Sequence, residues 1–150
     1  MQVILIAAVT ADGFIARHKN EIITWSRDLQ LFKELTMGWP VIMGSNTFET
    51  MPINLKGRDI HVMHRDNDPE KVLQNLNSEK CFIAGGGKTN ARFSAFLTHM
   101  YLTIHPFIFG KGIPLFDGRV NELKLVLEEQ VDVIPGEGIF QFKYRILKKK

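Results

Sequence analysis

The sequence has 150 residues, a length that suits one domain and is sufficient to bury a hydrophobic core. Hydrophobic residues make up 45% and charged residues 23%, which is ordinary for a globular protein, and no apolar run approaches the length of a membrane span. No signal-peptide pattern opens the sequence, and Cys81 is its only cysteine, so we exclude disulfides and cysteine-rich zinc sites. We therefore expect a cytoplasmic protein without membrane contact.

The formal net charge is +3, but Lys148, Lys149 and Lys150 alone account for that excess. The rest of the chain is therefore close to neutral, and a basic terminal run is usually a solvated tail. We expect no nucleic-acid binding. A mildly positive surface still suits a small ligand that carries phosphates or carboxylates.

Strands and helices are expected to alternate up to residue 97, and strands alone to follow. Residues 3–9 are continuously apolar, which is typical of a strand buried on both faces. A long loop follows at residues 10–25, and a helix is expected at residues 28–37 because Gly38 and Pro40 come directly after it. The remaining expected elements are strands at 41–43, 59–63, 80–84, 101–105, 123–130 and 139–147, and helices at 46–51, 69–76 and 88–97.

This order of elements predicts the fold class. Alternating strands and helices indicate an α/β protein with a mixed, mostly parallel central sheet flanked by helices. Pro135-Gly136 separates the last two strands and predicts an antiparallel C-terminal hairpin. No repeat, linker or low-complexity tract interrupts the sequence, so we expect residues 1–150 to form a single domain.

The helix expected at residues 28–37 carries one acid on an apolar face. Asp28, Leu31, Phe32 and Leu35 recur at helical spacing, so the carboxylate shares a face with the hydrophobic side chains. Two interpretations are open at this point. Asp28 is either a helix cap or a buried acid with a chemical role.

Two glycine-bearing turns connect a strand to a helix, as a phosphate site requires. Gly85, Gly86 and Gly87 allow close approach of a ligand to the backbone, and Lys88 adds a positive charge. The turn at residues 44–47 repeats the arrangement, so two helix N-termini could hold a pyrophosphate between them. The spacing fits neither a G-x-G-x-x-G fingerprint nor a P-loop. His64-Arg65 either binds a further phosphate or belongs to a solvated loop.

The stretch D-L-x-x-F-K-x-L-T-x-x-x-P-V-I-M-G-x-x-T-F-E from Asp28, followed by L-x-G-R ending at Arg58, resembles the dihydrofolate reductase family. So do I-L-I-A-A-V near the N-terminus, the triple glycine before a helix, and Tyr101-Leu-Thr. The resemblance implies a single-domain dihydrofolate-reductase-like fold. It also implies reduction of 7,8-dihydrofolate to tetrahydrofolate in one-carbon metabolism, by hydride transfer from NADPH to C6 with protonation at N5.

The resemblance also implies roles for individual residues. Asp28 matches the acid that hydrogen-bonds the pterin, and its burial against apolar neighbours should raise its pKa. Arg58 matches the arginine that grips the glutamate α-carboxylate of folate. The implied substrate-binding residues are Ile6, Ala7, Leu29, Phe32, Met51, Leu55, Arg58 and Thr103, and the implied cofactor-binding residues are Ala8, Ile15, Gly44, Ser45, Asn46, Thr47, His64, Arg65, Gly85, Gly86, Gly87, Lys88 and Thr89.

The sequence departs from the family pattern at several positions. Ser45-Asn46 stands where the family usually has a basic residue for the adenosine 2′-phosphate, and His64-Arg65 could compensate, so we expect NADPH rather than NADH. The long loop lacks the usual Pro-Trp, because Ile22-Ile23 stands there and Trp25 comes later. Asn90 replaces the usual tyrosine beside the nicotinamide.

A second resemblance keeps an alternative open. The segment H-P-F-I-F-G-K-G-I-P-L-F, residues 105–116, resembles the riboflavin-pathway reductase domain, which also uses NADPH but acts on a pyrimidine ribose. Asp28 and Arg58 together favour the folate substrate over that one. A non-catalytic nucleotide-binding module is a third possibility. The histidines show no ligand-like spacing, so no metal is expected, and the oligomeric state is left as monomer or homodimer.

Overall fold

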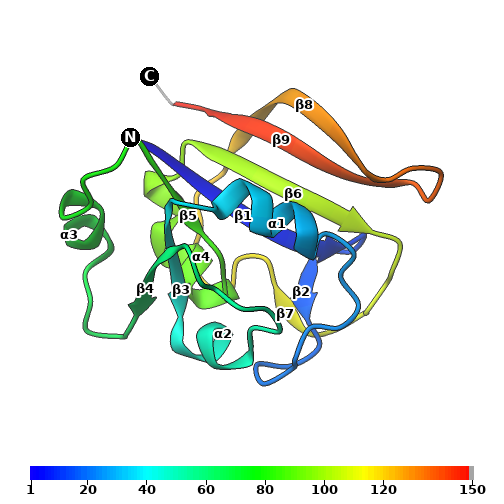
Figure 1. Ribbon diagram of the computed structural model, residues 1–150, viewed down its shortest axis with the longest axis horizontal. Coiled ribbons are helices and arrows are strands. Elements are labelled where there is room, and N and C mark those ends of the chain that lie inside the picture. Colours follow the sequence, from blue (N-terminus) through cyan, green and yellow to red (C-terminus); the bar gives the residue numbers. More distant parts are fainter. Residues whose placement is uncertain (149–150) are drawn as a thin grey trace.

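The computed structural model describes residues 1–148, and a seven-stranded sheet in the order β4-β3-β5-β1-β6-β9-β8 forms its centre (Figure 1). Its strands are β1 (Gln2–Thr10), β3 (Pro40–Gly44), β4 (Asp59–Met63), β5 (Lys80–Ile83), β6 (His99–His105), β8 (Lys124–Ile134) and β9 (Ile139–Leu147). Strands β4, β3, β5, β1 and β6 run parallel, and β9 and β8 add an antiparallel edge. The expected mixed, mostly parallel α/β fold with a C-terminal hairpin is confirmed.

Strand β1 lies between β5 and β6 and divides the core into two apolar clusters. Alternate residues of a strand point to opposite faces, so Val3 and Leu5 contact one cluster while Ile4 and Ile6 contact the other. This explains why the expected strand reads as one continuous apolar run. Cys81 on β5 is fully buried, and this burial raises the pKa of its thiol to about 11, so the side chain stays protonated in the core.

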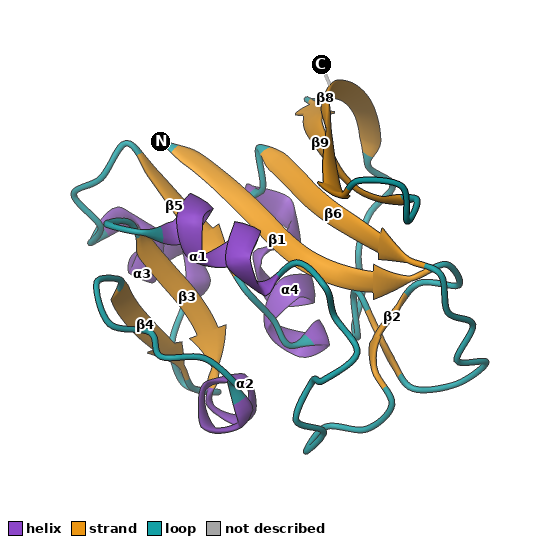
Figure 2. Ribbon diagram, turned by 45° about the vertical axis from the view of Figure 1, so that its right-hand side comes forward, coloured by secondary structure: helices purple, strands orange, loops and turns teal. Residues whose placement is uncertain are grey.

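The helices cover both faces of the sheet. Helix α1 (Leu29–Thr36) packs Phe32 and Leu35 on the cluster around Ile4 and Ile6. On the other face lie α3 (Pro69–Gln74) and α4 (Gly87–Phe93), and Figure 2 shows α1 in front of the strands and α3 behind them. Helix α3 begins at Pro69, as expected, and the Asp68 carboxylate caps it by accepting a hydrogen bond from Glu70 N at 3.1 Å.

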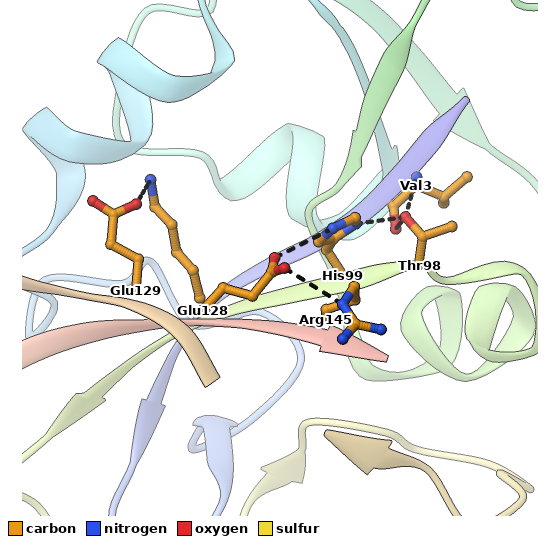
Figure 3. Close-up of polar contacts among 7 residues, drawn as sticks. Val3, Thr98, His99, Glu128, Glu129 and Arg145 are labelled. Atoms are coloured by element: carbon orange, nitrogen blue, oxygen red, sulfur yellow. Dashed lines mark hydrogen bonds and ion pairs between the residues drawn. The ribbon is translucent and has the colours of Figure 1, made fainter. Parts of the chain in front are cut away.

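A glutamate of the C-terminal hairpin contacts a histidine of the parallel part of the sheet. Figure 3 shows the Glu128 carboxylate between His99 Nε2, at 3.6 Å, and Arg145 Nε, at 3.4 Å. The other ring nitrogen of His99 lies 2.8 Å from Thr98 Oγ1. One glutamate on β8 therefore contacts side chains of β9, its neighbour in the sheet, and of β6, the strand beyond β9.

Several boundaries differ from those expected. The region expected to be a loop contains β2 (Phe14–Ala16), which pairs with β7 (Ile113–Pro114), and neither short strand was predicted. Strand β8 continues to Ile134, beyond its expected end at residue 130, and its register against β9 shifts between Leu127 and Glu129 and between Asp132 and Ile134. Helix α2 (Ser45–Thr50) starts one residue earlier than expected. Helix α4 ends at Phe93 and a 3₁₀ turn, Ser94–Phe96, completes the expected segment.

Within residues 1–148, no helix is both long enough and apolar enough to cross a bilayer. Lys148 is exposed, and the other two lysines of the expected basic tail, Lys149 and Lys150, lie outside the described residues.

Candidate active site

A cleft of about 620 Å³ opens where β1, β3 and β5 end. In open α/β sheets, ligands bind outside the carboxyl ends of the strands. One part of this cleft is lined by Asp28 and α1, and another by the glycine turns that follow β3 and β5. Asp28 and the two glycine turns thus line the same cleft.

Asp28 is a buried acid and not a helix cap. It is 7% exposed and immediately precedes α1, but its side chain makes no capping hydrogen bond. Its backbone carbonyl accepts from Phe32 N at 2.9 Å, which fixes the first helical turn. Of the two interpretations that the sequence left open, the structure therefore favours the buried acid over the helix cap.

Burial raises the pKa of Asp28 above its usual range, as expected, because the charged form loses hydration in the wall of the cleft. The nearby Thr103 hydroxyl lowers the pKa, and burial outweighs it. Although Thr103 lies close to the carboxyl, it does not reach hydrogen-bond geometry, and its Oγ1 is buried without a partner among the described residues. A carboxyl in this setting holds a proton at higher pH than an exposed one.

The two glycine turns lie against each other. Gly44 N donates to Gly85 O at 2.9 Å, which joins the end of β3 to the turn after β5. A Cβ at Gly44 would stand 2.9 Å from Thr89 Oγ1, closer than real Cβ atoms approach. Gly85 has a φ of +87°, a backbone conformation that favours glycine. The sequence therefore places glycine where the backbones must meet.

Asn90 fixes the triple-glycine turn from within. It is fully buried at the start of α4, where its Oδ1 accepts from Gly85 N at 3.1 Å. Its Nδ2 donates to Leu115 O at 2.9 Å, in the segment that follows β7. The residue that departs from the family pattern thus positions the backbone of the turn.

A basic group lies at the mouth of the cleft, at the loop between β4 and α3. His64 and Arg65 are both exposed there and both line the cleft. Arg92 of α4 braces this loop, with Nη1 donating to His64 O at 3.0 Å and Nη2 to the carbonyls of Arg65, at 3.4 Å, and of Asn67. The loop is therefore held by a cation that also faces the cleft.

The loop that carries Ile22-Ile23 forms another wall, but Trp25 does not line the cleft. The Trp25 ring is buried, and it packs edge-on against His105, Phe107 and Phe109 at centroid distances of 5.3, 6.1 and 5.3 Å. Trp25 is therefore part of an aromatic cluster behind the site, while Ile23 faces the cleft.

Most of the candidate site residues meet in this cleft. Its lining includes Ile6, Ala7, Ala8, Ile15, Asp28, Leu29, Phe32, Gly44, Ser45, Asn46, Thr47, Met51, His64, Arg65, Gly85, Gly86, Gly87, Lys88 and Thr89. The candidates outside the lining are Leu55, Arg58 and Thr103. Leu55 packs against the α1-side core, and Thr103 is buried behind Asp28.

Arg58 lies in a shallower depression beside α1, which it shares with Lys33 and Lys56. Its Nε donates to Thr36 Oγ1 at 3.1 Å, and its terminal nitrogens donate to Lys56 O at 2.7 Å and Lys33 O at 2.6 Å. A guanidinium has five N–H donors, so two remain for a ligand.

The cleft also contains residues that the sequence did not indicate as site residues. Lys19 and Glu21 come from the long loop, and Ile113 and Asp117 from the segment around β7. No local pattern marks them, because the pairing of β2 with β7 brings distant segments together. Arg92 could have been suspected from its place one helical turn after Lys88. No group of three or more potential metal-ligating side chains occurs within residues 1–148.

Comparisons with known proteins agree with this geometry. A family model described as dihydrofolate reductase matches residues 2–107, more than half of the chain. The type 8 dihydrofolate reductase of Escherichia coli is 46% identical over 121 residues, covering 65% of this chain and 70% of that protein. The dihydrofolate reductase of Bacillus subtilis is 30% identical over 128 residues, covering 75% of each.

A solved structure shows the same fold over nearly the whole chain. It is dihydrofolate reductase from Enterococcus faecalis complexed with NADP(H) and RAB-propyl, with a TM-score of 0.73 and 20% identity, covering 98% of this chain and 97% of that one. The fold that the resemblance implied is thereby confirmed. With the match to the family model, these findings show that the chain belongs to the dihydrofolate reductase family.

Proposed function

We propose that the protein reduces 7,8-dihydrofolate to 5,6,7,8-tetrahydrofolate with NADPH, with Asp28 as the acid of the reaction. The observation that carries the proposal is the buried carboxyl of Asp28 in the same cleft as the two glycine turns. The enzyme family supports this reaction over the riboflavin-pathway alternative and over a binding-only role.

The glycine turns fit a dinucleotide. A Cβ at Gly44 would stand 2.9 Å from Thr89 Oγ1, and Gly85 has a φ of +87°, so glycine at these two positions leaves the backbone of the turns open. Ser45, Asn46, Thr47 and Lys88 add hydrogen-bond donors around the turns. When bound, NADPH supplies the hydride that the reaction consumes.

On the substrate side, the chain binds and orients the pterin and manages its proton. Asp28 hydrogen-bonds the pterin amino group and ring nitrogen, and its raised pKa lets the carboxyl hold a proton that is delivered toward N5. Phe32, Met51 and Ile6 form an apolar wall that excludes water from the reacting ring. Thr103 supports the carboxyl from behind.

Arg58 binds the α-carboxylate of the folate tail with the two N–H donors that its bonds to Thr36 Oγ1, Lys56 O and Lys33 O leave unused. The guanidinium is already held by three acceptors, so little side-chain freedom is lost when a carboxylate pairs with it. The neighbouring Lys33 and Lys56 make the depression favourable for further negative charge.

Recognition of NADPH over NADH falls to His64 and Arg65. The Ser45-Asn46 pair carries no positive charge, whereas the loop after β4 presents an imidazole and a guanidinium at the same cleft. Arg92 holds the carbonyls of this loop and so fixes the backbone from which both side chains extend. The 2′-phosphate is therefore bound by the loop after β4 and not by the turn after β3.

The proposal extends to the setting of the enzyme. Residues 1–150 act as one domain in the cytoplasm, in one-carbon metabolism, as a monomer or homodimer. The partner is a small molecule and no nucleic acid is bound.

The test is loss of reduced-nicotinamide absorbance with purified protein, dihydrofolate and either NADPH or NADH. Turnover with dihydrofolate and a preference for NADPH are expected. Turnover only with the pyrimidine ribosyl substrate of the riboflavin pathway, or NADPH binding without turnover of either substrate, would overturn the proposal.

A further inference from the structure

His105, the last residue of β6, is fully buried and both of its ring nitrogens are engaged. Arg27 N donates to Nε2 at 2.9 Å, and Nδ1 lies 3.0 Å from the carbonyl oxygen of Thr103. A backbone N–H can only donate and a carbonyl can only accept, so Nε2 carries the lone pair and Nδ1 carries the hydrogen. The contacts specify the neutral Nδ1–H imidazole.

The hydrogen bond from Arg27 bears directly on the acid. Arg27 is the residue before Asp28, and Thr103 is the residue of β6 whose hydroxyl lies close to the carboxyl. Helix α1 holds Asp28 only through the bond from Phe32 N to its carbonyl. His105 supplies the second anchor, on the other side of Asp28, and ties it to the strand that carries Thr103.

Aromatic side chains shield the hydrogen bond between Arg27 N and His105 from water. The Trp25 ring packs edge-on against the His105 ring, and Phe107 and Phe109 close the other sides of Trp25. The Arg27 side chain turns outward and pairs with Glu137 of the β8–β9 turn at 3.3 Å. Water therefore competes poorly for the bond between Arg27 N and His105.

We propose that His105 is a positioning residue of the reductase: by holding the backbone of Arg27 on β6, it fixes the Asp28 carboxyl between Thr103 and the cleft. The proposal rests on the role proposed above for Asp28. His105 does not line the cleft and acts only through Arg27. It also gives a function to the start of the H-P-F-I-F-G segment, which the reductase reaction itself does not explain.

Two polar substitutions distinguish the effect of the hydrogen bond between Arg27 N and His105 from the effect of packing by the imidazole ring. In His105→Asn the shorter amide can still donate to Thr103 O but cannot reach Arg27, whereas the longer amide of His105→Gln can accept from Arg27 N. His99→Asn is the matched control, since His99 lies at the other end of β6 and pairs with Glu128. Dihydrofolate turnover, its pH profile and the NADPH dissociation constant are measured for each protein.

A displaced catalytic group typically costs about 10²-fold in rate, so His105→Asn should lower turnover about 10- to 100-fold. The pH at which turnover declines should move downward, because a carboxyl released from its buried position is better hydrated. NADPH affinity should not change, since the glycine turns follow β3 and β5. His105→Gln should recover most of the native turnover, and His99→Asn should behave as the native protein.

Native turnover and pH profile in His105→Asn would overturn the proposal. An equal loss of turnover and of NADPH affinity in both the asparagine and glutamine variants would also overturn it, because that pattern indicates general loss of structure. Asp28→Asn is measured in parallel. If Asp28→Asn keeps full activity, the role of Asp28 itself fails, whereas loss in Asp28→Asn with native behaviour in His105→Asn removes His105 alone.

Discussion

Replacing Arg92 by methionine tests where the cofactor phosphate is recognised. The substitution keeps a long aliphatic side chain on α4 but removes the donors to the carbonyls of His64, Arg65 and Asn67. The loop after β4 then loses the guanidinium that braces it. We expect His64 and Arg65 to become less well placed for the 2′-phosphate.

The magnitude follows from these contacts. Hydrogen bonds to a charged group contribute about 1.5–3 kcal/mol, and the low end applies because the contacts are partly exposed and share one side chain. Weaker NADPH binding by about 1.5 kcal/mol corresponds to roughly a tenfold rise in its dissociation constant. NADH lacks the phosphate, so its dissociation constant should change much less.

The assay is a titration of each nicotinamide cofactor against native protein and variant, with Arg119→Met as the control. Arg119 is exposed and makes no ion pair within the described part of the chain. An unchanged ratio of NADPH to NADH affinity in Arg92→Met would refute the assignment of phosphate recognition to this loop. An unchanged ratio includes the case in which both cofactors bind equally more weakly.

Further predictions concern the acid, the tail site and the glycine turn. Burial raises the pKa of Asp28 in the folded protein above its value in the unfolded chain. The contribution of this carboxyl to the free energy of unfolding is therefore fully present below the unfolded-state pKa and is lost as pH rises through the folded-state pKa. In urea unfolding, Asp28→Asn should therefore gain stability over the native protein above that pH, by about 1.4 kcal/mol per unit of elevation, whereas Asp132→Asn should not. Arg58→Leu should weaken folate binding by about 1.5–3 kcal/mol but leave a pterin without glutamate unaffected, and equal losses would exclude the carboxylate contact. Gly44→Ala places a Cβ 2.9 Å from Thr89 Oγ1 and should cost about 1–3 kcal/mol in thermal stability and weaken NADPH binding, and native affinity would contradict the close approach of the turns.

Local sequence patterns predicted the elements that contribute most of the cleft. The apolar run of β1 and the Pro-Gly turn before β9 are short-range signals, and the bounds of β9 match those expected. The glycine turns were predictable for the same reason, since Gly44 lies too close to Thr89 for a Cβ and Gly85 has a positive φ. Asp28 was recognisable because a single carboxylate continues the apolar face of α1 from the position directly before the helix.

Long-range pairing explains what the sequence left out. The strands β2 and β7 are too short to show a period, and each is defined by a partner about a hundred residues away. Trp25 stands near the family's usual tryptophan in the sequence, but aromatic partners from beyond β6 draw it behind the site. The roles of His105 and Arg92 likewise depend on contacts with backbone atoms, which side-chain patterns do not reveal.

The most direct test of the account is the rate of hydride transfer in a single turnover of dihydrofolate, measured against pH in the native protein and in Asp28→Asn. The native rate should fall as pH rises through a pKa above that of an ordinary aspartate, because burial holds the proton on Asp28. The variant should be slower by about 10²- to 10⁴-fold near neutral pH and approach the native rate only in acid, where solvent supplies the proton. Equal rates for the two proteins across this range would contradict the central claim that Asp28 is the acid of the reaction.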